Sequence, residues 1–487
     1  MTSSHLSQKR EALVCVIRAF NGQNFPESVD SILNELDREG YYDTCYHSVQ
    51  HKHAIQRALV MAALGSSGEN DSENTPLSKY AGIALERTEP SSPPLAVLGC
   101  ACNGCEPSHI CVPDLCQNCV TKPCVAACRF DAIHNAGKKS VINVQCCKKC
   151  RACLRGCPYG AISETVVPCE HVCPVDAISK DERGRAVIDF DKCIRCGKCM
   201  AACPFEAIQV RSQVIDVLKA IKAKKKVIAL VAPALFGQFR CTAGQLHTAM
   251  KKIGFSFVYE VAIGAESTSF HEAKDLKEKL GKGEKFMTTS CCAAYNNLVS
   301  KHISEMRPFV STAGTPLFYT AEYVRREHPD SVLIFISPCL AKYEEAFANE
   351  NVGYILNFGE IDALFEAFAI VAGECAEEKF AYDSARETRE FSLSGGVSRA
   401  VQSVLDGNGT KVEFATINGL DRETVKDLKR FAKAGECDRG TVLEVMSCQG
   451  GCVGGGLTCC PVAAATRQVK KYGDDGTSLS DKKERGS

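Results

Sequence analysis

Apolar positions along the chain follow two different periods, and the change between them divides the chain into regions. In the first 95 residues they recur at helical spacing over 28–39 and 53–64, which predicts a small helical domain. Further along, the short, mostly apolar runs 227–232 and 331–336 indicate buried strands. Helical stretches, such as 360–371 and 424–433, alternate with these runs. That alternation predicts an α/β domain over about 212–465.

Polar stretches separate these regions. Residues 66–76 predict a loop and 89–94 a proline-rich linker, while the charged residues at the end predict a flexible tail. A chain of 487 residues exceeds one ordinary core, so several domains are expected. The predicted boundaries are 1–95, 96–165, 166–211 and 212–465, with the tail at 466–487.

Cysteine content separates this chain from an ordinary globular protein. Of its 31 cysteines, 19 lie between Cys100 and Cys203. A disulfide scaffold would be short and secreted, whereas the first residues here are polar and lead into no apolar signal segment. No apolar run reaches the roughly 18 residues that a membrane span needs. The expectation is a reduced, cytoplasmic protein whose thiolates hold metal.

Charge adds little to this picture. The 58 basic and 58 acidic residues cancel, so bulk charge favours neither a nucleic-acid nor a membrane partner. Three lysines at 224–226 could dock an acidic partner, but a solvated turn before a strand is the default interpretation. His47, His51 and His53 could bind metal, but surface positions on a helix are the simpler interpretation.

The cysteines between 116 and 203 repeat the spacing of bacterial ferredoxins. Complete copies of Cys-x2-Cys-x2-Cys-x3-Cys-Pro begin at Cys147 and Cys193, a variant begins at Cys116, and a truncated copy begins at Cys169. Each copy ends in Ala-Ile, at 132–133, 161–162, 177–178 and 207–208. Four equal endings are an internal repeat, which predicts two tandem α+β ferredoxin-like modules over 96–165 and 166–211.

In such modules the first three cysteines of a copy bind one 4Fe-4S cubane, and the fourth binds the neighbouring cubane. This exchange predicts three accessory clusters. Their expected ligands are Cys116, Cys119, Cys124 and Cys157 for the first, Cys147, Cys150, Cys153 and Cys128 for the second, and Cys193, Cys196, Cys199 and Cys173 for the third.

Two further metal ligands are expected at Cys169 and Cys203, which lack two partners because the opening cysteine triplet of the second module is missing. A fourth accessory cubane is expected, with its other ligands unassigned. Zinc at Cys102-x2-Cys105 is the alternative. The available donors are Cys100, Cys102, Cys105 and Cys111, which could complete this cluster in pairs or form a cluster of their own, and Cys146 is also spare.

Three cysteine segments in the α/β region form a second constellation. They are Thr-Ser-Cys-Cys at 289–292, Pro-Cys-x2-Lys-x2-Glu at 338–345, and Glu-x-Met-x-Cys-x3-Cys at 444–452. Together they offer the four thiolates that a cubane requires and one spare thiol beside them.

These segments, in this order, resemble the signature loops of FeFe hydrogenases, and the resemblance covers about 212–465. It implies an H-cluster, which is a 4Fe-4S cubane joined to a di-iron subsite that carries carbon monoxide, cyanide and a bridging azadithiolate. The implied ligands of the cubane are Cys292, Cys339, Cys448 and Cys452, with Cys452 also bridging to the di-iron subsite.

The resemblance also implies a proton path. Cys291 would be the proton relay and Lys342 would hold a cyanide, while Glu266 and Glu345 would be the carboxylates of the path, linked by Thr315. The positions implied to line the cofactor pocket are Ala232, Pro233, Ser337, Met446, Gly395 and Gly396.

Three departures from the best-known members indicate a divergent subgroup, similar to the one called group B. Ala293 stands where those enzymes have proline, and Ser337 stands where they have methionine. The glycine run at 453–457 is shorter than, or shifted from, the usual pattern.

The resemblance implies an enzyme that reversibly oxidises dihydrogen to protons and electrons, with ferredoxin or flavodoxin as electron carrier and hydrogenase maturation proteins as assembly partners. A hydrogen sensor and a cytosolic iron–sulfur assembly factor are the alternatives. Cys291, Lys342 and Glu345 favour the enzyme, because neither alternative requires a proton relay.

Overall fold

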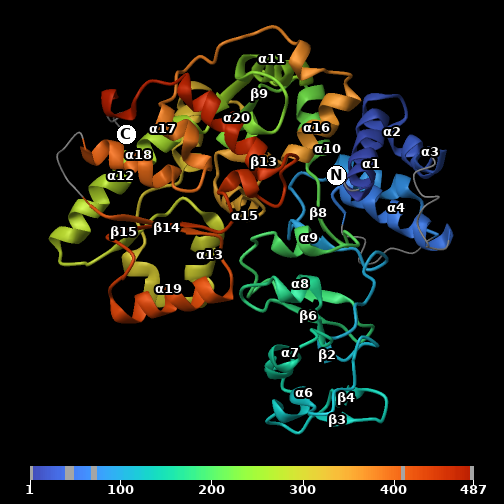
Figure 1. The fold of residues 1–487 in the computed structure, drawn as a ribbon. Coiled ribbons are helices and arrows are strands. Elements are labelled where there is room, and N and C mark those ends of the chain that lie inside the picture. The colour runs from blue at the N-terminus through green and yellow to red at the C-terminus, as the bar shows by residue number, and fades with distance from the viewer. Residues whose placement is uncertain (1–3, 39–48, 67–73, 407–411, 483–487) are drawn as a thin grey trace.

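The N-terminal region of the computed structural model is helical, as predicted (Figure 1). The structure describes residues 4–38, 49–66, 74–406 and 412–482. The helices of this region are α1 (Ser4–Asn21), α2 (Phe25–Val29), α3 (Ile32–Arg38), α4 (Val49–Ala63) and α5 (Leu77–Glu86). His47 and most of the predicted 66–76 loop lie outside the described residues, as does the side chain of His51.

The single helix predicted over 28–39 is two helices in the structure. The break lies at Asp30 and Ser31, between α2 and α3. Ser28 Oγ donates to the Asn24 carbonyl at 2.7 Å, and Ser31 Oγ donates to the Ser28 carbonyl at 2.8 Å. Serine hydroxyls that bond nearby backbone in this way compete with a continuous helix.

A buried ion pair joins the N-terminal helices to α10 (Val214–Lys222). Arg87 donates to the Asp216 carboxylate from Nε at 2.9 Å and from Nη2 at 2.6 Å, and its Nη1 donates to the Leu64 carbonyl. The Asp216 side chain is 1% exposed. One residue pair therefore holds α4, the end of α5 and α10 together.

We expect Asp216→Ala to lower the free energy of unfolding by about 3–5 kcal/mol, because the change leaves the Arg87 guanidinium buried without its counter-charge. Chemical or thermal unfolding of the full chain measures this loss. The control is Glu436→Ala, which breaks an exposed pair with Lys285 and should cost less than about 1 kcal/mol. Equal losses in the two variants would contradict the structural role of the buried pair.

The two ferredoxin-like modules are nested in the structure, whereas the cysteine spacing predicted consecutive modules. Strand β1 (Leu95–Val97) pairs antiparallel with β8 (Ile208–Val210), and β6 (Ile178–Lys180) pairs with β7 (Ala186–Ile188). Between β1 and β6 the chain builds a complete second unit, in which β2 (His109–Cys111) pairs with β5 (Ser163–Thr165) and β3 (Ile133–Asn135) with β4 (Ser140–Ile142). The outer module is therefore 95–107 with 166–210, and 109–165 is inserted into it.

Four short helices each carry the cysteine at the third position of a copy, which in the truncated copy is Cys169. They are α6 (Pro123–Ala126), α7 (Ala152–Gly156), α8 (Pro168–His171) and α9 (Lys198–Ala202). Figure 1 shows them in a column in the order α6, α7, α8, α9, with α9 next to the C-terminal domain. The modules thus form an arm that leads from an exposed tip to the body of the protein.

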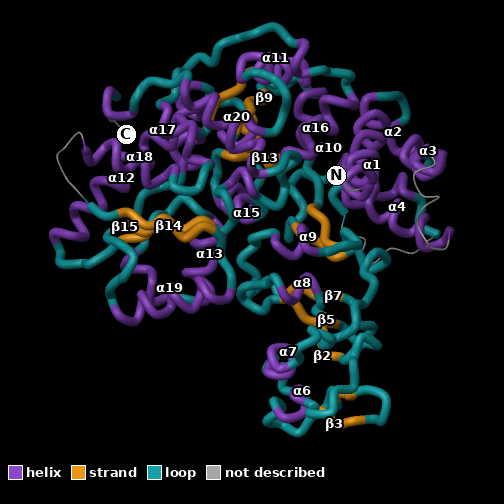
Figure 2. Tube along the Cα trace, in the orientation of Figure 1, coloured by secondary structure: helices purple, strands orange, loops and turns teal. Residues whose placement is uncertain are grey.

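The C-terminal domain is α/β, as predicted, and contains two parallel sheets (Figure 2). One has the order β10 (Phe257–Glu260), β9 (Val227–Val231), β12 (Val332–Ile336), β13 (Val352–Leu356). The other has the order β11 (Met287–Thr288), β15 (Val442–Met446), β14 (Phe414–Asn418). Every residue of β9 is buried, which explains its unbroken apolar run.

Helices enclose both sheets. They include α11 (Ala243–Ile253), α12 (Ala262–Gly281), α13 (Ala293–His302), α14 (Pro316–Glu327), α15 (Ala341–Ala348), α16 (Phe358–Ala367), α17 (Arg386–Arg389), α18 (Gly396–Asp406) and α19 (Arg422–Ala434). The helices predicted at 360–371 and 424–433 correspond to α16 and α19.

The prediction of a flexible tail over 466–487 is wrong for its described part. Helix α20 (Val462–Asp474) continues through it and packs Ala465, Val469 and Tyr472 against the core. These residues recur at helical spacing, a signal that the charged composition obscured. Leu479 is also buried, and Lys482 pairs with Glu266 at 2.7 Å. Residues 483–487 lie outside the described part.

No helix among the described residues combines the length and the apolar character that crossing a bilayer requires.

Candidate active site

Each of the three cysteine segments follows a strand of one of the two parallel sheets, and the segments meet at one cavity. Cys291 and Cys292 follow β11, Cys339 follows β12, and Cys448 follows β15. The carboxyl ends of parallel strands are where α/β sheets usually place their sites. The cavity has a volume of about 100 Å³, and its wall is mostly apolar.

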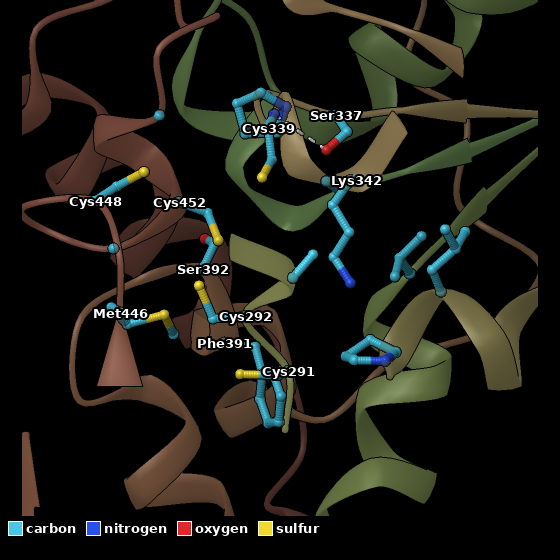
Figure 3. A pocket seen from close by; sticks show the side chains of 18 of the residues that line it. Cys291, Cys292, Ser337, Cys339, Lys342, Phe391, Ser392, Met446, Cys448 and Cys452 are labelled. Atoms are coloured by element: carbon cyan, nitrogen blue, oxygen red, sulfur yellow. Dashed lines mark hydrogen bonds between the residues drawn. The ribbon is translucent and has the colours of Figure 1, made fainter. Parts of the chain in front are cut away.

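The four thiols predicted to bind a cubane all line this cavity (Figure 3). Burial is the main reason that the pKa of Cys339 rises to about 11 and that of Cys452 to about 12, while the pKa of Cys448 lies well above its ordinary value. Neighbouring thiols add to each increase. With raised pKa values, Cys339, Cys448 and Cys452 hold their protons near neutral pH, so metal binding would have to release them.

Among the residues that the structure describes, no three His, Cys, Asp or Glu side chains converge closely enough for one metal ion. A cubane is several Å across and holds its thiolates further apart than one ion does.

Glycines let the third loop approach the second loop and the segment around Ser392 closely. A Cβ on Gly455 would lie 2.6 Å from the Pro338 carbonyl oxygen, and one on Gly451 would lie 2.5 Å from the Ser392 carbonyl oxygen. Gly451 also has a φ of +90°, which other residues rarely adopt. The glycines after Cys448 therefore allow a close backbone contact that brings Cys452 to the cavity.

Lys342 reaches into the cavity from the start of α15 (Figure 3). Its Nζ lies 2.5 Å from Glu345 Oε2, and Thr315 Oγ1 donates to Glu345 Oε1 at 2.5 Å. Burial acts to lower the pKa of Lys342, but the Glu345 carboxylate outweighs it and the pKa is raised. Glu345 thus keeps a buried lysine charged and fixes its direction. The predicted contact between Thr315 and Glu345 is present.

Glu266 lies elsewhere, although the resemblance placed it on the proton path with Glu345. Its carboxylate accepts hydrogen bonds from Tyr382 Oη at 2.6 Å, the Ala385 backbone N–H at 2.8 Å and Lys482 Nζ at 2.7 Å. It does not line the cavity, and Thr315 is not among these partners. Through these contacts Glu266 holds α12 against the segment before α17 and the segment after α20, so its role in the structure is to stabilise the fold.

Glu272, which the sequence analysis missed, lies beside Cys291. It is fully buried on α12, and its Oε1 accepts from Ser290 N–H at 2.9 Å and from Ser290 Oγ at 3.2 Å. Burial raises the pKa of Glu272 to about 7. Burial first, and then the Glu272 carboxylate, raise the pKa of Cys291 well above that of an ordinary thiol.

Asp275 lies one helical turn after Glu272 on the same face of α12 and is half-buried. Its Oδ2 accepts from the Thr312 N–H at 2.6 Å. The available sequence signal was the spacing of three between these two carboxylates, which places them on one helix face.

Among the predicted pocket positions, Ala232, Pro233, Ser337 and Met446 line the cavity, but Gly395 and Gly396 do not. Gly395 N–H donates to Glu444 Oε1 at 2.7 Å, and a Cβ on Gly396 would lie 2.2 Å from the Glu390 carbonyl oxygen. Both glycines therefore allow the tight turn of the backbone at the start of α18, instead of lining the cavity. The sequence analysis missed other residues that line the cavity, because they belong to none of the three cysteine motifs. They include Ala265, Pro316, Leu317, Phe335, Phe391 and Ser392.

The accessory cysteines gather around three small cavities of the arm. One is lined by Cys116, Cys119, Cys124 and Cys157, the next by Cys128, Cys147, Cys150 and Cys153, and the third by Cys173, Cys193, Cys196 and Cys199. Each group is one of the predicted ligand sets. Cys196 also lines the main cavity and packs with Cys292 and Cys339 against Ala293, Ala294 and Ala341.

Comparisons with known proteins agree with this architecture. Residues 225–456 match the family model described as the C-terminal domain of the iron-only hydrogenase large subunit, and residues 163–214 match a model for an LdpA Fe-S cluster-binding domain. The periplasmic Fe hydrogenase large subunit of Nitratidesulfovibrio vulgaris is 26% identical over 307 residues, which are 51% of this chain and 72% of that protein.

Two longer relatives match as well. Iron hydrogenase 1 of Clostridium pasteurianum is 24% identical over 44% of this chain, and a subunit of the NADP-reducing hydrogenase of Solidesulfovibrio fructosivorans is 25% identical over 44%. The chain spans about half the length of these two, since each match covers 45% of the relative. A solved FeFe hydrogenase from Chlamydomonas reinhardtii is 18% identical with a TM-score of 0.44, covering 55% of this chain and 90% of that one.

Proposed function

Since this chain is an FeFe hydrogenase-like protein, divergent at 24–26% identity to the relatives above, we propose that it catalyses the reversible oxidation of dihydrogen to two protons and two electrons. The observation that carries the proposal is the convergence of the five thiols of the three cysteine segments and one charged lysine on a single cavity. The same cavity borders Cys196 of the arm, so a site for chemistry and a route for electrons meet there.

The residues present fit an H-cluster. Cys292, Cys339, Cys448 and Cys452 would bind its cubane, with Cys452 also bridging to the di-iron subsite. Lys342, which Glu345 keeps charged, would donate to a cyanide of that subsite. When bound, the cluster would supply an open metal position for dihydrogen and exchange electrons with the accessory cubanes. The apolar wall would exclude water from this position.

Cys291 would transfer protons between the cavity and the interior of the domain. It is the one thiol of the cavity segments that the cubane does not need. Glu272 would receive the proton next, because it lies beside Cys291 and its pKa of about 7 suits both uptake and release near neutral pH. Asp275 would continue the path toward the surface in the role that the resemblance gave to Glu266.

The arm would carry electrons between the cavity and a ferredoxin or flavodoxin. The inserted module, 109–165, contains eight basic and three acidic residues. Its tip exposes Leu115, Val120 and Tyr159 beside cluster cysteines. A basic surface with apolar contacts suits an acidic carrier, and its association rate should fall with salt. Hydrogenase maturation proteins would insert the di-iron subsite, and a cytoplasmic location would suit these partners.

The test is anaerobic maturation of the full chain, followed by two measurements. We expect dihydrogen evolution from reduced viologen, and infrared bands of metal-bound carbon monoxide and cyanide. A properly matured protein without those bands would overturn the di-iron assignment, whereas bands without turnover would favour a sensor.

A further inference from the structure

Pairing of β1 with β8 brings the cysteines before the inserted module to those that follow it. We propose that a fourth accessory cubane binds to Cys102, Cys105, Cys169 and Cys203. We further propose that it transfers electrons between the inserted module and the cubane of Cys173, Cys193, Cys196 and Cys199. The binding site stands on the geometry of the arm alone, and only the electron route rests on the proposed function.

The nested topology accounts for the missing cysteine triplet. In a ferredoxin copy, two cysteines of the loop and a third on the following helix bind one cubane with the last cysteine of the partner copy. Here the chain leaves the outer module after Cys105 and returns at α8, which carries Cys169. The loop cysteines and the helix cysteine of one copy are therefore separated in sequence by the whole insertion.

The backbone of the Cys102–Cys105 loop repeats that of the other cluster loops. Gly104, the residue before Cys105, has a φ of +58°. Each of the three other copies has an equivalent residue, which directly precedes the second cysteine of a Cys-x2-Cys pair. These residues also have positive φ: Asn118 at +49°, Lys149 at +52° and Arg195 at +57°. Positive φ is uncommon outside glycine, so its recurrence at one position indicates a shared loop conformation.

The segment after Cys203 also matches its counterparts. Glu206, three residues after Cys203, has a φ of +48°. The residues at this position in the other copies are Asp131 at +53°, Gly160 at +60° and Asp176 at +51°. In those three copies the next backbone N–H donates to the cysteine sulfur at 3.2–3.4 Å. Both ends of the proposed site therefore have the conformation found around the three cysteine-lined cavities.

Contacts select Cys102 and Cys105 from the available donors. Both pack against the core cluster that contains Cys169 and that Cys203 also contacts. Cys102 Sγ accepts from the Ala186 N–H of β7 at 3.3 Å, a type of N–H···S bond that also occurs in the other copies. Cys169 lies on α8 and Cys203 directly follows α9, and these two helices are in contact with each other.

The other donors point elsewhere. Cys100 is exposed, and its Sγ donates to the Ala54 carbonyl of α4 at 3.3 Å. Cys111 lies on β2 of the inserted module, with its Sγ 3.2 Å from Ser163 Oγ. Cys146 is exposed in that same module. None of the three belongs to the core cluster that holds Cys169.

The position of α8 gives this fourth cubane its role. In the column of Figure 1, α8 lies between α7 and α9. Helix α7 carries Cys153 of the inserted module, and α9 carries Cys199 of the cubane nearest the main cavity. Electron transfer falls steeply with distance, so a cubane at α8 would fill the gap between these two.

Metal analysis of the full chain tests the site without any need for hydrogenase activity. The protein is produced without hydrogenase maturation proteins and reconstituted anaerobically with iron and sulfide. The double variant Cys102→Ser/Cys105→Ser should hold about four iron atoms fewer than the wild type. Cys169→Ser gives an independent variant on the other side of the insertion and should lose the same cubane.

Matched controls are Cys100→Ser and Cys111→Ser, which should retain the full iron content. Electron paramagnetic resonance of the reduced double variant should still show the other cubanes, which verifies that the arm is folded. Unchanged iron in the double variant, zinc bound in place of iron, or loss of a cubane from Cys100→Ser would each overturn the proposed ligand set.

The electron route has its own readout. In the matured double variant we expect the carbon monoxide and cyanide bands to remain, while the rate with reduced ferredoxin falls relative to the wild type. An unchanged ferredoxin-driven rate, with the cubane shown to be absent, would overturn the route but not the binding site. Failure of the proposed function would appear separately, as a wild type that lacks the bands.

Discussion

Replacing Cys291 by alanine is expected to lower dihydrogen turnover by about 10²–10⁴-fold, the usual contribution of a positioned proton donor or acceptor. The infrared bands of the matured protein should remain, because Cys292, Cys339, Cys448 and Cys452 are unchanged and can still bind the cluster. The side chain lines the cavity beside Glu272, so its loss interrupts the path at the first proton transfer.

The control for this change is Cys375→Ala. Cys375 is also buried, but it packs against the core away from the cavity and donates to the Val371 carbonyl at 3.6 Å. Its replacement removes the same atoms from the interior and should leave turnover near that of the wild type. If Cys291→Ala retains turnover while its bands persist, Cys291 is not the relay.

Replacing Glu272 by glutamine is expected to lower turnover by about 10²-fold or more, because an amide keeps the shape and the acceptor for Ser290 but cannot exchange protons. Turnover with reduced viologen measures the effect. The matched control is Glu266→Gln, which lies on the same helix and contacts Lys482 instead of the cavity. A large loss in Glu266→Gln with little loss in Glu272→Gln would restore the path implied by the sequence resemblance.

The raised pKa of Glu272 also predicts how its stability effect depends on pH. The folded protein keeps this carboxyl protonated up to about pH 7, whereas in the unfolded chain it ionises near its ordinary value of 4.5. The resulting stability is fully present below the ordinary pKa and is lost as pH rises through 7. The difference over this window is on the order of 3 kcal/mol.

Glutamine does not ionise, so Glu272→Gln should be more stable relative to the wild type at pH 8 than at pH 5. Thermal unfolding of the metal-free proteins at the two pH values measures this. A difference between the variants that does not change with pH would show that Glu272 has no raised pKa.

Local pattern identified much of the chemistry. The spacing of two and three residues between cysteines is a property of neighbouring positions, and it predicted three groups that the structure gathers around three cavities. The apolar runs likewise predicted β9 and β12, because strands buried on both faces need no polar positions.

Long-range contacts explain what local pattern missed. Glu266 and Glu272 are both buried acids on α12, and they differ in what packs against them: Lys482 from beyond α20 in one case and Ser290 beside Cys291 in the other. Long-range packing also decides the structure of the C-terminal segment. Its charged composition predicted a flexible tail, whereas Val469 and Tyr472 of α20 pack against the core.

The sequence by itself determined that this protein gathers thiols for iron–sulfur clusters, and that three segments of the α/β domain offer four thiols and one spare, because these features depend on spacing along the chain. Only the tertiary structure decided that one ferredoxin-like module is inserted into the other, and which carboxylate stands beside Cys291. The pairing of β1 with β8 joins residues more than a hundred positions apart. Such contacts depend on packing in three dimensions, which no local spacing encodes.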